Sequence, residues 1–185
     1  MLLSPRILGR LIFIAVTTFS FAAIAIAQPR DHLTDQETDL VRFHQQLDKR
    51  IDVFIKAMDR RFAIINGLEQ TKTKKLDKEE PDWGDLPKGS RAQLLGDIAS
   101  ILDEAITNID DVSRRDEKSP LISRSLRKLT AATNGYVTQV KSIAAQTKDA
   151  DELSAVERVL QQAEQIIEVG SQLPPPSADK KKSKP

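Results

Sequence analysis

Apolar residues recur at steps of three and four along most of the chain after residue 33, the spacing that places them on one face of an α-helix. The first such pattern starts at Thr34, which forms a capping-box sequence with Glu37, and it runs without an internal proline to Gly67. Its opposite face is polar and includes Arg60. We therefore expect one long helix over residues 34–67, with an apolar face made of Leu40, Phe43, Leu47, Ile51, Phe54, Met58, Phe62 and Ile65.

Three further patterns of the same kind follow, each opening at a polar capping residue, over residues 90–114, 119–146 and 148–169. Asn134-Gly135 falls inside the second of them and would indicate a turn elsewhere. We expect the helix to continue through it, at a cost of about 1 kcal/mol for Gly relative to Ala. Gly170 and the prolines that follow are expected to end the last helix.

Four helices that are apolar on one face must bury those faces against one another. The connections near residues 113–119 and 145–149 are short, which favours antiparallel neighbours. We find no alternating run of β-branched residues that would predict a strand. The expected fold is all-α, an antiparallel up-down-up-down four-helix bundle over residues 28–172.

The N-terminal region has the three parts of a secretory signal peptide. Arg6 and Arg10 precede an uncharged apolar run that closes on small residues before Gln28 and Pro29. We expect cleavage between Ala27 and Gln28 and export to the periplasm or the extracellular space, with no stable membrane span afterwards. The alternative is an uncleaved anchor, because the run is near the lower limit of about 17–25 residues for a membrane helix.

Charge is distributed unevenly along the remaining chain. Removal of residues 1–27 takes two arginines from 28 basic and 27 acidic residues, which leaves a net charge near −1. Residues 173–185, rich in proline and lysine, are expected to be a disordered tail, and the body before it is mildly acidic. An acidic body argues against binding to nucleic acid, which requires a basic face.

The residue types exclude several chemistries. There is no cysteine for a disulfide or for covalent haem, and no glutamate has a histidine three residues further on, as di-iron bundles require. Nucleophile-elbow and phosphate-loop motifs are also missing. We expect a protein that is not an enzyme and that holds no cofactor.

One pair of residues has the spacing of a metal clamp. On a continuous helix His44 and Asp48 would lie one turn apart, and Asp97, Glu104 or Asp111 could supply a third ligand. The competing interpretation is that His44, beside Phe43, is a boundary residue of the apolar face. The pair is therefore a weak candidate for a metal site.

The loop over residues 70–89 contains Trp83, the one tryptophan of the chain. Pro81 and Pro87 bracket a segment in which Trp83 and Leu86 lie three residues apart. These two side chains either close over the helices' own core or form a contact site for a partner, since tryptophan is favoured at interaction hot spots. We expect a protein-interaction or structural module that binds an unidentified protein or itself. The alternative is a metal- or ligand-binding sensor of the cell envelope.

Overall fold

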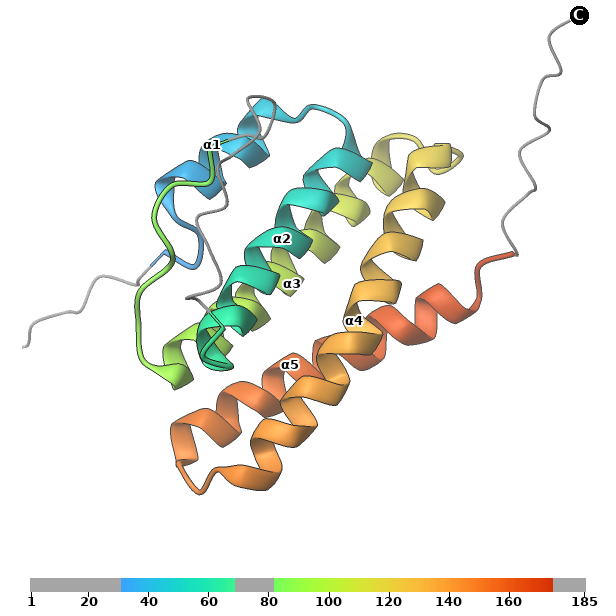
Figure 1. Ribbon diagram of the computed structural model, residues 1–185. Coiled ribbons are helices and arrows are strands. Elements are labelled where there is room, and N and C mark those ends of the chain that lie inside the picture. The colour runs from blue at the N-terminus through green and yellow to red at the C-terminus, as the bar shows by residue number, and fades with distance from the viewer. Residues whose placement is uncertain (1–30, 69–81, 175–185) are drawn as a thin grey trace, which may run out of the picture. The chain divides into compact units, whose positions relative to one another are not determined.

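The described part of the structure, a computed structural model, comprises residues 31–68 and 82–174. These residues form helices and connecting segments and contain no strand, so the expectation of an all-α fold is confirmed. The signal sequence with Ala27 and Gln28, the first part of the loop and the end of the tail lie outside the described residues. The helices, shown in Figure 1, are α1 (Asp35–Phe43), α2 (Leu47–Ile65), α3 (Arg91–Arg115), α4 (Pro120–Gln146) and α5 (Ala150–Ser171).

The helix starts lie close to the expected residues. Thr34 and Ser90 each accept a hydrogen bond from the backbone N–H three residues on, and both capping boxes are complete. Asp149 caps α5 by accepting from two backbone N–H groups. Ser119 stands at the cap of α4 without a side-chain bond, and Pro120 follows it at the first helical position, where the missing N–H costs nothing.

The single helix expected over residues 34–67 is wrong, because the chain leaves the helical conformation at His44 and resumes it at Leu47. The amide side chain of Gln45 donates to the carbonyl of Arg42 at 2.8 Å and so satisfies one free carbonyl at the end of α1. Phe43, expected on the apolar face, is 77 % exposed. The break turns α1 back along α2, as Figure 1 shows.

The last helix also differs from expectation. Gly170 does not end α5, which continues to Ser171. A Cβ atom at this position would collide with the side chain of Thr130 in α4. Gly170 therefore permits a close approach of α4 and α5, whereas Gly135 lies within an uninterrupted α4, as expected.

The four longer helices enclose an aliphatic core. Both α3 and α4 contact α2 and α5, and the contact between α3 and α4 themselves is smaller. No helix of the described residues is long and apolar enough to cross a membrane. The fully buried side chains of the core include Ile51, Phe54, Met58, Leu95, Ile98, Ile101, Leu102, Leu129, Val140 and Val159.

Candidate functional site

A buried carboxylate connects α1 to α2. Glu37, in the first turn of α1, has no solvent exposure, and its Oε1 accepts hydrogen bonds from Nη1 of Arg60 at 2.7 Å and Nη1 of Arg61 at 3.0 Å. Its Oε2 accepts from Nη2 of Arg61 at 2.9 Å and from the Thr34 backbone N–H at 3.0 Å. On one straight helix Glu37 and Arg60 would be about 35 Å apart, at 1.5 Å per residue. The break after Phe43 is therefore what makes this cluster possible.

Arg61 extends the same cluster toward α3 and the N-terminal segment. Its Nη2 donates to the carbonyl of His32 at 2.5 Å, and its Nε lies 3.6 Å from Oδ2 of Asp97 in α3. The side chain is almost fully buried and also donates to the carbonyl of Ala57. Burial of a charge is costly unless it is paired, and here both Nη atoms are hydrogen-bonded while Nε lies near the charge of Asp97 without a hydrogen bond.

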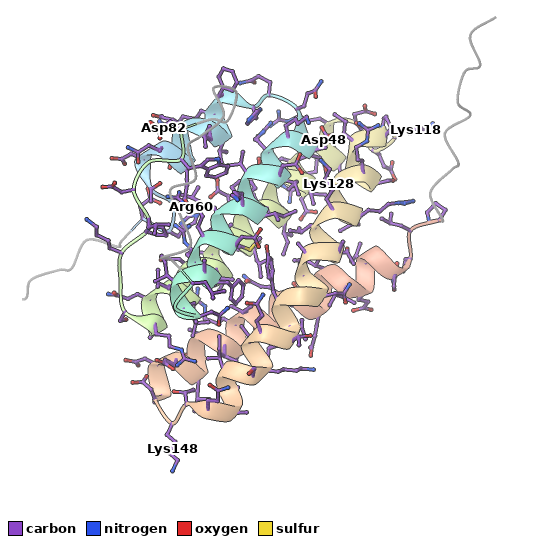
Figure 2. All side chains as sticks on the ribbon, in the orientation of Figure 1. Asp48, Arg60, Asp82, Lys118, Lys128 and Lys148 are labelled. Carbon is purple, nitrogen blue, oxygen red and sulfur yellow. The ribbon has the colours of Figure 1, made fainter. Side chains whose placement is uncertain are left out.

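Arg60 holds a segment far from it in sequence, residues 82–86, which we call the Trp83 segment. Its Nη2 donates to the carbonyls of Gly84 at 3.1 Å and Asp85 at 2.5 Å. Its guanidinium carbon lies 5.7 Å from the centre of the Trp83 ring, within the range of a cation–π contact. Burial lowers the pKa of Arg60, while the charge of Glu37 opposes that change. Figure 2 shows Arg60 on α2 and Asp82 at the start of the segment beside α1.

The Trp83 segment has a defined backbone conformation. Gly84 has φ of +60°, a region that side chains disfavour, and its N–H donates to Oδ1 of Asp82 at 2.9 Å. Pro87 is buried just after the segment, whereas Leu86 is 42 % exposed. Trp83 is half-buried. Arg60 thus lies over one face of the Trp83 ring. Leu86, three residues further on, exposes its side chain to solvent.

A second polar contact fastens the N-terminal segment to α3. Nε2 of His32 lies 2.7 Å from Oε2 of Glu104, and Asp31 lies 3.7 Å from the other ring nitrogen. The hydrogen bond to Glu104 raises the pKa of His32, although partial burial opposes it. The pair borders a polar hollow of about 550 Å³, which is also lined by Arg158 and Gln162 of α5.

The structure does not bring the predicted metal pair together on one helix. His44 follows the last residue of α1 and Asp48 lies in the first turn of α2, so the one-turn spacing no longer applies. Asp48 instead faces Arg124 at 3.5 Å and Lys128 at 3.9 Å. The proposed third ligands are separated as well, since Asp97 pairs with Arg61 and Glu104 with His32. Among residues 31–68 and 82–174 no group of three or more His, Asp or Glu side chains could hold a metal ion.

The apolar periodicity predicts Arg60 on a solvated face, but the structure buries it. The capping box indicates Glu37 only as a capping residue, and Arg61 is not among the predicted site residues. Arg61 carries a usable signal in the sequence, because it lies three residues after Met58 and four before Ile65 and therefore falls on the apolar face of the helix. An arginine near an apolar face requires a partner, and the capping Glu37 is the one that the fold supplies.

No known family model, curated protein or solved structure matches the chain.

Proposed function

We propose that the protein is an exported, non-enzymatic four-helix-bundle module that binds another protein in the cell envelope or extracellular space, and that the Trp83 segment is its contact site. The observation that carries this proposal is the fixation of that segment by Arg60, which binds two of its carbonyls and the face of its tryptophan. A fixed backbone reduces the entropy lost on binding.

The side chains of the segment suit a protein contact. Leu86 exposes much of an apolar side chain, and Trp83 retains a partly open ring. Tryptophan and arginine are both enriched among the residues of interaction hot spots. Carbonyl groups that are already bonded to Arg60 add no desolvation cost when a partner covers them. The segment thus offers apolar area without unpaired carbonyls at Gly84 and Asp85.

Export is supported by the basic start, apolar run and small-residue end of residues 1–27. Expression of the full chain in a secreting host should give a soluble product whose N-terminal residue is Gln28. Recovery of the intact chain from membranes would instead favour the uncleaved anchor.

The contact site can be tested by capture from an envelope extract. Immobilised wild-type protein should retain a specific protein that is lost with Leu86→Asp. Leu153→Asp is a matched control, since Leu153 on α5 is 39 % exposed and lies outside the Trp83 segment. Equal retention by both variants would contradict the placement of the site, and a wild-type protein that retains nothing specific would contradict the proposed function.

A further inference from the structure

An apolar hollow of about 420 Å³ lies among α3, α4 and α5, away from the residues that hold the Trp83 segment. This volume falls within the range of about 300–1,000 Å³ that is typical of small-molecule sites, which often lie between packed helices. Its wall is aliphatic and is built from all three helices, with Ile106, Ile109, Leu126, Leu129, Ile166 and Val169 as its apolar residues.

The wall is well supported by the core. Leu129 is fully buried, and Ile109, Leu126 and Ile166 are buried with it. Val169, by contrast, is 52 % exposed, so the hollow is open to solvent on the α5 side. An apolar group entering there would cover aliphatic surface at the mouth and contact a wall that is already ordered.

The polar residues at the hollow are either acidic or neutral. They are two carboxylates, Asp110 and Glu168, and two amides, Gln165 and Gln172, and none of the lysines or arginines that the structure describes lines the hollow. Within residues 31–68 and 82–174, neither carboxylate side chain has an ion-pair or hydrogen-bond partner. The mouth therefore favours positive charge beside an apolar interior.

We propose that this hollow is a binding site for a small amphiphilic amine, with its hydrocarbon part against the aliphatic wall and its ammonium group at Asp110 and Glu168. A hydrocarbon anion of the same length would meet two like charges. A neutral alcohol would gain the apolar contact alone. The head group therefore determines which of these ligands binds most tightly.

The test uses octylammonium, octanoate and octanol as probes of one chain length, titrated into the full chain while methyl NMR signals of Ile, Leu and Val are followed. Octylammonium should shift the methyl signals of Ile106, Leu126 and Val169 and bind about three- to tenfold more tightly than octanol, as expected for partly exposed charge pairs. Octanoate should bind more weakly than octanol.

Two variants identify the site. Asp110→Asn with Glu168→Gln should abolish the preference for octylammonium, whereas Glu157→Gln with Glu164→Gln removes the same charge elsewhere on α5 and should preserve it. Val169→Trp fills the open side at an exposed position and should suppress binding of all three probes. Equal affinities for the three probes, or methyl shifts that survive Val169→Trp, would overturn the proposal. Failure of the amine-binding proposal would leave the proposed contact at Leu86 unaffected, because that contact is tested separately by protein capture.

Discussion

At the scale of single residues, the feature that dominates this molecule is a cluster of charges in its interior. Glu37 and Arg61 are both almost completely removed from solvent, and Arg60 is nearly so. Buried ion pairs contribute little net stability compared with apolar residues of similar volume. Loss of one member of such a pair, in contrast, lowers the free energy of unfolding strongly, because the remaining charge stays in a poorly solvating environment.

Replacement of Arg61 by methionine should therefore lower the free energy of unfolding by about 3 kcal/mol, since it removes two hydrogen bonds from buried Glu37. Urea unfolding monitored by circular dichroism measures this change. Arg124→Met provides the comparison, because Arg124 is largely exposed and pairs with Asp48 at 3.5 Å; its loss should cost less than about 1 kcal/mol. Equal costs for the two variants would contradict the importance of burial.

His32 should make stability depend on pH. Its pKa in the folded protein is raised, chiefly by the hydrogen bond to Glu104 and further by Asp31 and Asp97. A raised pKa means that the folded state binds the proton more tightly. The stabilisation is thus fully present below the unfolded-state pKa of about 6.5 and is lost as pH rises through the folded-state value.

The variant His32→Gln should consequently lose more stability at pH 5.5 than at pH 8.5, with a difference of about 0.5–1 kcal/mol for a partly exposed pair. Urea midpoints of both proteins at the two pH values give the comparison. A cost that is the same at both values would show that protonation of His32 does not stabilise the fold.

At the scale of helices, local signals in the sequence predicted most of the starts, and contacts between distant segments determined the rest. Thr34 and Ser90 cap helices through bonds to residues three positions away, so their role is visible in the sequence alone. The break at His44 is not, because its benefit is the contact of Glu37 with Arg60 and Arg61. The role of Gly170 likewise depends on Thr130 of another helix.

Two of the three glycines inside the described helices, Gly135 and Gly170, should respond in opposite ways to alanine. A Cβ at Gly135 meets no atom within 4 Å, so Gly135→Ala should raise the free energy of unfolding by about 0.5–1 kcal/mol through the entropy of the unfolded chain. Gly170→Ala should lower it, since the added Cβ would overlap Oγ1 and Cγ2 of Thr130, so that the Thr130 side chain or one of the two helices would have to shift. Thermal unfolding of both variants tests the pair. Stabilisation by Gly170→Ala would disprove the close approach.

At the scale of the whole molecule, the aliphatic faces of the four longer helices were predictable, and the interior charges were not. Periodicity reports which residues share a helix face, and that is sufficient for Ile98, Leu102 and Val140. It does not report where α1 lies once the helix is broken. The sequence could likewise single out Trp83 and Leu86, but it could not indicate that Arg60 binds the carbonyls of Gly84 and Asp85 between them.

The chain's one tryptophan makes the attachment of the Trp83 segment measurable. Unfolding in urea followed by tryptophan fluorescence and by circular dichroism should give coincident transitions, because the segment is fixed to α2 through a buried cluster. In Arg60→Gln the fluorescence transition should occur at lower urea than the loss of helix. Separate transitions in the wild-type protein would show that the segment detaches independently.

The contacts of Glu37 also connect the local opening of α1 to that of the Trp83 segment in the native state. The same carboxylate completes the capping box of α1 and binds both arginines, and Arg60 in turn binds the carbonyls of Gly84 and Asp85. Detachment of α1 would take Glu37 away from both arginines, and detachment of the Trp83 segment would leave Nη2 of the buried Arg60 without its two carbonyl partners. Backbone amides of α1 and of Gly84 should therefore exchange their hydrogens in one shared opening event. A partner that holds the segment closed would thereby slow exchange in a helix that it does not touch.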